Sequence, residues 1–303
     1  MTERPLLECI PNFSEGRNEQ VVAQIASAIE SVAGLAILHQ TSDSDHHRSV
    51  ITFAGKPESV LEASFRMIEM AARLIDLDHH QGVHPRLGAT DVVPFVPLKG
   101  ITLAESAELA HRLGERVGRE LGLPVYLYEA AATRPERRNL ADVRRGGYEQ
   151  LKDEIHLPER QPDYGAAQVG KAGAVIIGAR QALIAFNVFL NSEDVRIAQA
   201  IARAIRGSSG GLVGLKALGL LVDGRAQVSM NVVDYPRTPL HRIFELIRRE
   251  AAYFGVGIHH SELIGLIPQA ALLETAAWYL QLHEFDDQRV LENRLLSVAD
   301  KFE

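Results

Sequence analysis

The sequence lacks several features that would place it in whole classes of protein. Its one cysteine, Cys9, cannot form an internal disulfide, and no cysteine spacing typical of a metal site is present. None of the 303 residues belongs to an apolar run long enough to cross a bilayer, and the N-terminal segment is not typical of a signal peptide. These absences favour a cytoplasmic protein that has no membrane partner.

An excess of positive charge is also missing. The chain has 32 Lys and Arg against 39 Asp and Glu, giving a net charge of −7. Non-specific nucleic-acid binding needs a basic surface that displaces counterions, so we expect no nucleic-acid partner. A small anionic ligand needs only a local group of Arg and Lys, so the net charge does not exclude one.

What the sequence does contain is enough apolar material for two modest cores, at 46% hydrophobic residues. In the first half, the patterning predicts strands and helices in an order that begins strand, helix, strand, strand, helix, strand. The expected strands are 6–13, 34–40, 49–55 and 92–97, and the helices are 20–32 and 57–77. A helix at 102–122 and a strand at 124–129 follow.

The second half repeats this order. We expect a strand at 182–190, a helix at 192–206 with Ser192 as N-cap, a hairpin of 215–223 and 225–235, a helix at 238–255, a strand within 256–268 and a closing helix at 269–282. The order predicts an α+β fold of two ferredoxin-like α/β sandwich subdomains, each with helices on one face of an antiparallel sheet. We place the subdomains at 1–180 and 181–303, with a ligand groove between their sheets.

His84 lies in the stretch GVHPRLGATDVVPF, residues 82–95. Pro85 prevents a helix here, and the apolar run after Asp91 predicts a buried strand, so His84 belongs to a loop. An imidazole with a pKa of about 6.5 can accept or donate a proton at neutral pH. The pattern leaves two alternatives open, a catalytic histidine and one that packs or caps. Arg86 beside it could hold a carboxylate or simply be exposed.

The other histidines predict no metal site. Three pairs occur, His46-His47, His79-His80 and His259-His260, and adjacent residues on a strand or helix point apart. No H-E-x-x-H or similar spacing is present. We therefore interpret the pairs as polar loop or surface residues and expect no metal cofactor.

Two further segments have a composition suited to a ligand. The glycine-rich stretch 162–181 includes Gly165, Gly170 and Gly173, which would let backbone N–H groups approach a ligand closely, although it fits neither the dinucleotide nor the Walker pattern. At 225–235, Gln227, Ser229 and Asn231 share one strand face. That neutral row either faces a heteroaromatic ligand or faces solvent on an edge strand.

Several blocks together resemble the glutamate formiminotransferase family, whose domain also forms the front half of formiminotransferase-cyclodeaminase. The resemblance runs in order from about residue 6 to 296 and rests on LLECIPNFSEGRN (6–18), HPRLGATDVVPFVP (84–97), PVYLYEAAA (124–132), RRGGYEQL (144–151), PDYG (162–165), GARQALIAFNVFLN (178–191), AQVSMNVVDY (226–235) and SELIGLIPQAALL (261–273). It implies two ferredoxin-like subdomains with folate between them, a homodimer, a role in histidine degradation and one-carbon metabolism, and a separate cyclodeaminase as a functional partner.

The resemblance also implies which residues act. The catalytic histidine of the family falls on the HPR motif, hence His84. The folate-contacting segment falls on Gly165, Ala166, Ala167, Gln168, Val169, Gly170, Lys171, Ala172 and Gly173. We expect the row Gln227, Ser229 and Asn231 to face the same groove.

The implied reaction moves a formimino group from N-formimino-L-glutamate to N5 of tetrahydrofolate, a co-substrate. As N5 attacks the amidine carbon, it must lose a proton, and the departing amine of glutamate must gain one. One neutral histidine can do both in sequence. Both substrates carry carboxylates, for which Arg48, Arg86 and Lys171 are candidate anchors.

The sequence departs from the family pattern at two positions near the expected site. An acidic residue usually precedes the HPR motif, where this chain has Val83, and another usually follows the second strand, where it has Thr41. Asp43 or Asp45 could substitute from the neighbouring loop. Two alternatives therefore stay open: a different one-carbon donor such as N-formylglutamate or 5-formyltetrahydrofolate, and a folate-binding paralogue without catalysis.

Overall fold

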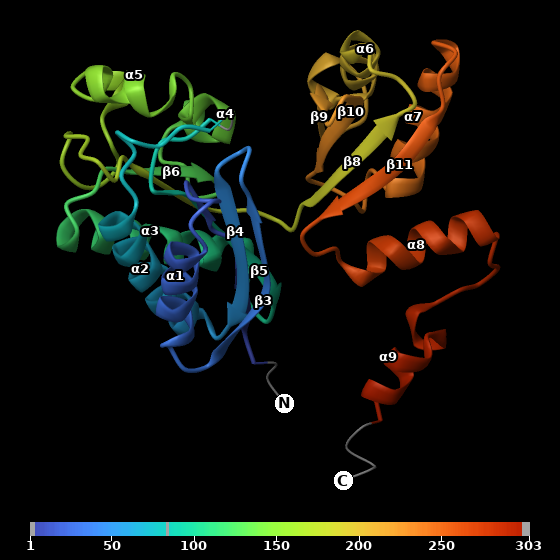
Figure 1. Ribbon diagram of the computed structural model, residues 1–303. Helices are drawn as coiled ribbons and strands as arrows, with labels where there is room; N and C mark the ends of the chain where they lie inside the picture. The colour runs from blue at the N-terminus through green and yellow to red at the C-terminus, as the bar shows by residue number, and fades with distance from the viewer. Residues whose placement is uncertain (1–3, 83–84, 299–303) are drawn as a thin grey trace. The chain divides into compact units, whose positions relative to one another are not determined.

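The chain folds into two compact α+β units that divide after Gln181, each with its own sheet and core (Figure 1). The computed structural model describes residues 4–82 and 85–298. Both units contain the predicted order of strands and helices, which confirms the fold class. Within the described residues, no helix is long and apolar enough to span a membrane.

The first unit begins with the ferredoxin-like order. Its elements are β1 (Leu6–Cys9), β2 (Asn12–Phe13), α1 (Glu19–Glu30), β3 (Leu35–Asp43), β4 (Arg48–Gly55), α2 (Pro57–Leu74) and β5 (Thr90–Lys99). β1 and β2 both pair with β4 and β5, so they act as the single strand that the sequence predicts, interrupted at Ile10-Pro11. Pro11 has no N–H to donate to a neighbouring strand, which accounts for the break. β3 completes this antiparallel part by pairing with β4.

Two more strands extend this sheet. After α3 (Leu103–Glu120) come β6 (Val125–Glu129) and later β7 (Val175–Ala179), and β7 lies between β5 and β6, parallel to both. The expectation of a purely antiparallel sheet was therefore wrong for the first unit. It failed because β7 lies inside the glycine-rich stretch that we interpreted as a loop. All of Val175–Ala179 is buried, as is typical of a parallel strand covered on both faces.

Helices cover both faces of the extended sheet, which corrects the expectation that they lie on one face only. α1, α2 and α3 pack over one face, around core residues such as Ile25, Phe53 and Leu113. The other face, over β6 and β7, packs Tyr126 and Ile176 against the segment that follows β6. That segment contains η1 (Pro135–Arg137), α4 (Leu140–Val143), α5 (Gly147–Glu154) and η2 (Pro158–Arg160).

The second unit has the ferredoxin-like fold without an extension of its sheet. Its elements are β8 (Ile184–Leu190), α6 (Val195–Ile205), η3 (Gly207–Ser209), β9 (Leu215–Val222), β10 (Arg225–Val232), α7 (Leu240–Tyr253) and β11 (Ile258–Ile264). The strand order is β11-β8-β10-β9, and every pairing is antiparallel. The hairpin turns at Asp223-Gly224 as predicted. The N-cap of α6 is Asp194 rather than Ser192, whose hydroxyl accepts from the Asp194 N–H.

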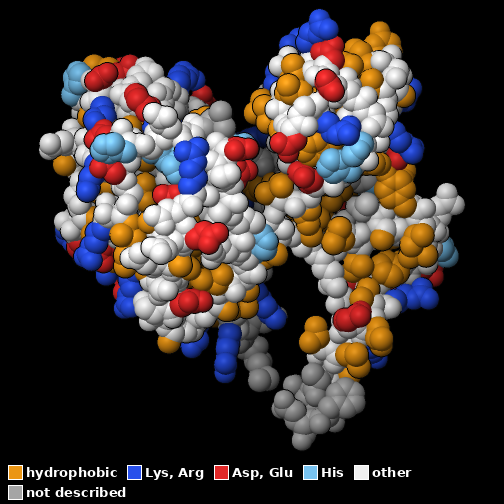
Figure 2. All heavy atoms as spheres, viewed as in Figure 1, with side chains coloured by type: hydrophobic (Ala, Val, Ile, Leu, Met, Phe, Trp, Pro, Cys, Tyr) orange, Lys and Arg blue, Asp and Glu red, His pale blue; other side chains and the backbone are white. Residues whose placement is uncertain are grey.

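The C-terminal helices of the second unit expose much apolar surface. α8 (Gln269–Leu280) buries only Ala271, and η4 (Asp287–Arg289) and α9 (Leu291–Leu296) bury no residue. Figure 2 shows hydrophobic side chains gathered over this region. The exposed large apolar residues here are Leu272, Trp278, Tyr279, Leu280, Leu282, Leu291, Leu295 and Leu296.

Candidate active site

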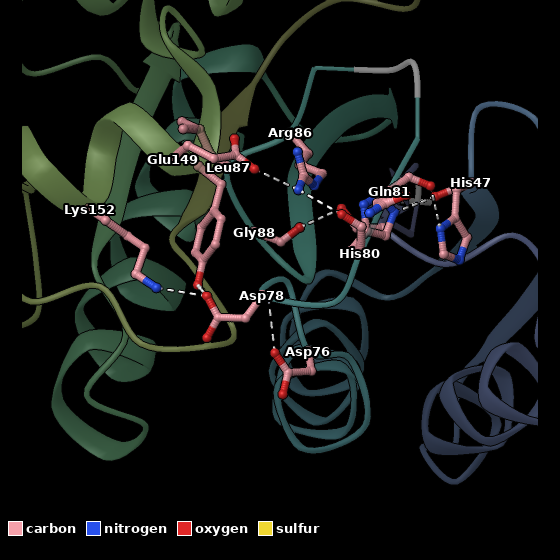
Figure 3. Close-up of polar contacts among 12 residues, drawn as sticks. His47, Asp76, Asp78, His80, Gln81, Arg86, Leu87, Gly88, Glu149 and Lys152 are labelled. Atoms are coloured by element: carbon pink, nitrogen blue, oxygen red, sulfur yellow. Dashed lines mark hydrogen bonds and ion pairs between the residues drawn. The ribbon is translucent and has the colours of Figure 1, made fainter.

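The loop predicted to carry the catalytic histidine connects α2 to β5 in the first unit. Val83 and His84 themselves lie outside the described residues. The chain on either side of them is described, from Asp76 to Gly82 and from Pro85 onward (Figure 3). The surroundings of the site can therefore be built from these two flanks.

The N-terminal flank is held by two stacked histidines. The rings of His47 and His80 lie 4.2 Å apart at an angle of 8°. His80 Nε2 lies 2.9 Å from the His47 carbonyl oxygen, and His47 Nδ1 lies 3.1 Å from the Gln81 carbonyl oxygen (Figure 3). The pair thus fixes the backbone just before the histidine motif. Gly82 packs so closely here that a Cβ would lie 2.5 Å from the carbonyl oxygen of His46.

The two stacked rings have different surroundings. Burial, with help from nearby His47 and Arg86, lowers the pKa of His80, so this ring is neutral at pH 7. The Nε2 of His47 lies 3.0 Å from Glu15 Oε1. Burial alone would raise the pKa of Glu15, but hydrogen bonds from backbone N–H groups and from His47 lower it. The His47 ring of the stacked pair therefore contacts a carboxylate, that of Glu15.

The C-terminal flank is held by Arg86. Its guanidinium donates to the His80 carbonyl oxygen at 3.0 Å and to Glu149 Oε1 of α5 at 2.8 Å (Figure 3). The Arg86 side chain is only 12% exposed, whereas that of Glu149 is 67% exposed. Arg86, one of the candidate carboxylate anchors, thus already binds the His80 carbonyl oxygen and the Glu149 carboxylate. A substrate carboxylate would have to take the place of Glu149.

A buried carboxylate lies at the start of β5, just beyond this flank. Asp91 is fully buried, and its Oδ1 accepts the Leu87 N–H at 2.9 Å. Its Oδ2 accepts from two guanidiniums, Arg48 at 2.8 Å and Arg144 at 2.5 Å. Burial alone would raise the pKa of Asp91, but these two cations lower it. The candidate anchor Arg48 therefore lies in an ionic cluster that also ties down the histidine loop.

The glycine-rich segment ends against the same flank. Gly173 has a φ of +68°, and a Cβ there would lie 2.1 Å from the Leu87 carbonyl oxygen. The Ala89 N–H donates to the Ala172 carbonyl oxygen at 2.9 Å, and Gly88 and Gly173 form an isolated β-bridge. The fold therefore joins the predicted folate segment to the histidine loop. Only Gly allows this approach at residue 173.

Most of that segment is open to solvent. Ala172 and Gly173 are buried and Val169 is half-buried, whereas the exposed residues are Gly165, Ala166, Ala167, Gln168, Gly170 and Lys171. Its first residue, Gly165, has a φ of +83° and packs against the end of α3 and the turn after it, because a Cβ there would lie 2.1 Å from the Leu123 carbonyl oxygen and 3.3 Å from Gly118 Cα. The segment is thus anchored at both ends and exposes its backbone between them.

The neutral row belongs to the second unit, on β10. Its opposite face buries Ala226, Val228 and Met230, as the alternation predicts. Along the row itself exposure rises: Gln227 is 4% exposed, Ser229 is half-buried and Asn231 is exposed. Gln227 lies opposite Phe189 of β8, whose ring stacks on His260. β10 lies between β8 and β9, so the alternative of a solvent-facing row on an edge strand was wrong about the edge, and the alternative of a row that faces a ligand stays a prediction.

One expectation about the paired histidines was wrong. His259 and His260 do not point apart, because their Nδ1 atoms lie 2.6 Å from each other. The pairing of β11 with β8 shifts in register between Ile258 and His260, and such an irregularity turns a side chain out of the alternation. Among the described residues, no group of three or more potential ligands could hold a metal ion.

Sequence reasoning missed much of the polar framework. Arg144 was quoted only as part of RRGGYEQL, and Asp91 only as the residue before a strand. Glu15 and Glu149 also lie in segments that resemble the family, but neither was predicted to belong to the site. Two local signs were available. Asp91 is a charged residue at the start of a buried strand, and Arg144 lies just before Gly146-Gly147, between the end of α4 and the start of α5.

Comparisons with known proteins show the family of the chain. The family model of the N-terminal subdomain of the formiminotransferase domain matches residues 6–180, and that of the formiminotransferase domain matches residues 185–299. Glutamate formimidoyltransferase of Streptococcus pyogenes is 46% identical over 295 residues, which cover 96% of this chain and 99% of that protein. The protein of the same name from Thermoplasma acidophilum is 48% identical over 299 residues, covering 97% and 99%.

A longer relative extends the comparison. Formimidoyltransferase-cyclodeaminase of Sus scrofa is 41% identical over 284 residues, which cover 91% of this chain and 52% of that protein. Among solved structures, a microcompartment protein from Desulfitobacterium hafniense covers 89% of this chain and 98% of its own, at 10% identity and a TM-score of 0.22, too low to support an argument. The matches to the family models span nearly the whole sequence, and the chain belongs to the formiminotransferase family.

Proposed function

We propose that the protein transfers the formimino group of N-formimino-L-glutamate to N5 of tetrahydrofolate, giving 5-formiminotetrahydrofolate and L-glutamate. The observation that carries this proposal is the identity of 46–48% with two proteins named glutamate formimidoyltransferase over nearly their full length. The polar framework around the histidine loop supports it, because it would hold a proton-transferring group in place.

His84 is the proposed proton carrier. It would take the proton that N5 loses and return a proton to the departing amine of glutamate. Both flanks of its loop are fixed by hydrogen bonds, through Gln81 on one side and through Arg86 and Leu87 on the other. Holding a general base in one position lowers the entropic cost of reaching the transition state.

Tetrahydrofolate is the proposed co-substrate, bound by the backbone of 165–173. This segment fits such a role because residues 165–168 are exposed while Gly165 and Gly173 anchor its ends. Pterin rings present several donors and acceptors, which peptide groups can pair. We also assign Gln227, Ser229 and Asn231 to folate binding, and Arg48, Arg86 and Lys171 to the carboxylates of the two substrates.

The departures at Val83 and Thr41 favour a second candidate, a folate-dependent transferase with another donor such as N-formylglutamate or 5-formyltetrahydrofolate. Residue 41, which is exposed on β3, is a threonine. It therefore offers no carboxylate to pair with the cationic amidinium of formiminoglutamate. The Asp43 carboxylate is already engaged by the backbone N–H groups of Asp45 and His46 and by the His46 ring. A third candidate is a folate-binding paralogue without catalysis.

A donor comparison tests the proposal. Purified protein is incubated with tetrahydrofolate and either formiminoglutamate or N-formylglutamate, and separately with 5-formyltetrahydrofolate and L-glutamate as the acceptor, and the folate products are followed spectroscopically. We expect kcat/KM for formiminoglutamate to exceed that of either formyl donor. A preference for a formyl donor would establish the second candidate, and folate binding without turnover would establish the third.

The cellular setting is part of the proposal. We assign the protein to the cytoplasm and to histidine degradation, with a separate cyclodeaminase acting on its product. The name of the Sus scrofa relative, which joins both activities, supports that partner. We also propose a homodimer, because the exposed apolar residues of α8 and α9 form a surface of the kind that marks association. Light scattering on the purified protein measures the oligomeric state.

A further inference from the structure

The ionic cluster of Arg48, Asp91 and Arg144 carries an unbalanced positive charge. Two guanidiniums share a single oxygen of one carboxylate, and the other oxygen of Asp91 is taken by the Leu87 N–H. The Asp91 side chain is 0% exposed, and those of Arg48 and Arg144 are 10% and 14% exposed. A buried net charge is costly unless an opposite charge pairs with it.

A second buried ion pair in the same unit shows what a balanced arrangement looks like. Arg137 and Asp163 are each 5% exposed and face one another as one cation and one anion. The remaining contacts of Asp163 are neutral, from the Leu127 N–H and the Thr133 hydroxyl. Arg137 also donates to the Gln161 carbonyl oxygen. This pair is electrically complete, whereas the cluster around Asp91 has one cation too many.

Arg144 has an unused hydrogen-bond donor in the cluster. Its Nε is buried and has no hydrogen-bond partner among the described residues. Among the described residues, its ion pair is the one to Asp91. The strain on the cluster is also visible at Arg48, where burial and the repulsion of Arg144 lower the guanidinium pKa to about 10 despite the attraction of Asp91. A further anion would relieve both effects.

The cluster is tied to the loop that carries His84 from both sides. Leu87, whose N–H binds Asp91, follows His84 by three positions in the chain. Arg48 directly follows His47, whose ring holds the Gln81 carbonyl oxygen before the histidine. An anion bound by the two arginines would therefore lie beside the described flanks of the loop to which the predicted proton carrier belongs.

We propose that Arg144, together with Arg48, binds the α-carboxylate of the amino-acid donor, with Asp91 as the positioning residue that holds both guanidiniums in place. This inference rests on the proposed function and names a subsite of it. The α-carboxylate is attached to the same carbon that carries the formimino nitrogen, so it must lie close to the proton carrier. The carboxylates of tetrahydrofolate lie at the far end of its tail, away from N5. The class of ligand is an N-substituted α-amino acid.

The test compares Arg144→Gln with Arg137→Gln in the full chain. Losing a charge-assisted hydrogen bond to the donor should raise its KM roughly 10- to 100-fold in Arg144→Gln, while the KM for tetrahydrofolate changes less than about twofold. Arg137→Gln should lower the melting temperature and leave the donor KM within about twofold of wild type. An unchanged donor KM in folded Arg144→Gln, or an equal rise in both variants, would overturn the proposal.

Two additions keep the test decisive. Arg144→Lys retains the charge but not the planar fork, so its donor KM should lie between those of wild type and Arg144→Gln, and it decides the question if the Gln variant does not fold. Calorimetric titration with L-glutamate, the reaction product, measures the subsite without turnover. Binding by wild type that Arg144→Gln loses supports the subsite even if formiminoglutamate is not the donor. Equal binding by both proteins would refute it.

Discussion

The two units share one folding pattern but differ in what they bury. Each contains a four-stranded antiparallel core with the ferredoxin-like order, β3-β4-β1/β2-β5 in the first and β9-β10-β8-β11 in the second. The first unit then adds β6, β7 and the segment between them, which covers the second face of its sheet. The second unit adds α8 and α9, which bury almost nothing.

Among the described residues, the buried pairs of arginine and carboxylate lie in the first unit, and the added segment contributes an arginine to each. Arg137 lies in η1 and Arg144 at the C-cap of α4, and each reaches a carboxylate that is 5% exposed or less. The ion pairs of the second unit are local and open to solvent, as in Arg196–Asp194, where the arginine is 84% exposed. A repeated scaffold has thus acquired a charged, covered region in one copy only. The predictions below test this division.

The largest effect is expected at His84, which the division assigns to the unit with buried charge. His84→Ala should lower kcat by about 10²- to 10⁴-fold, because proton transfer to and from the reacting nitrogens is lost. Tetrahydrofolate affinity should stay close to wild type. Steady-state kinetics and calorimetric titration measure the two quantities. An equal loss of turnover and folate binding would show that His84 has a binding or structural role instead.

Asp91→Asn should have the next largest effect. It leaves two buried guanidiniums without a counter-charge and should destabilise the first unit by about 3 kcal/mol or more. Hydrogen exchange should become faster in β4 and β5 and stay unchanged in β9 and β10.

The matched control for Asp91 lies in the second unit. Asp194→Asn removes a charge from an exposed pair and keeps a good N-cap, so its effect should stay below about 1 kcal/mol. If Asp91→Asn and Asp194→Asn lower the free energy of unfolding by the same amount, burial of charge does not distinguish the two units.

A smaller effect is expected on β10. The double substitution Ser229→Ala, Asn231→Ala should weaken tetrahydrofolate binding by about 1 kcal/mol for each lost hydrogen bond, roughly fivefold. The melting temperature should hardly change, since neither side chain is fully buried. Gln199→Ala on the exposed face of α6 serves as the control. If the double variant binds tetrahydrofolate as tightly as wild type, Ser229 and Asn231 do not belong to the folate site.

The smallest effect concerns pH. Because the folded protein lowers the pKa of His80 below its ordinary value of about 6.5, the unfolded chain binds more protons at His80. This contribution to stability is present above pH 6.5 and is lost as the pH falls below it. The drop in melting temperature between pH 7.5 and 5.5 should therefore be smaller in His80→Asn than in wild type or in the surface control His283→Asn. An equal drop in melting temperature in all three proteins would contradict the assignment of this pH dependence to His80.

Local patterns predicted the elements but not the contacts between distant residues. The order of strands and helices, the break at Pro85 and the hairpin at Asp223-Gly224 all follow from periodicity and turn chemistry. β7 was hidden because the glycines around it are typical of a loop, and its partners β5 and β6 are distant in sequence.

The candidate site shows the same limit. Residues 85–88 could be assigned to a loop from residue type alone, whereas Gly173, predicted to let the backbone approach a ligand, packs against the Leu87 carbonyl oxygen instead. The ion pair of Arg144 with Asp91 joins residues 53 positions apart, and nothing in either local pattern announces it. Its existence depends on α4 folding over the sheet, which is a property of the tertiary structure.

The central claim is that an intact formimino group moves to folate, and an isotope label tests it most directly. Formiminoglutamate labelled with ¹⁵N in the formimino group is incubated with the protein and tetrahydrofolate, and the folate product is analysed by mass spectrometry. The account predicts that the label appears in 5-formiminotetrahydrofolate together with an equal amount of released L-glutamate. Glutamate release without labelled folate, or no release at all, would contradict it.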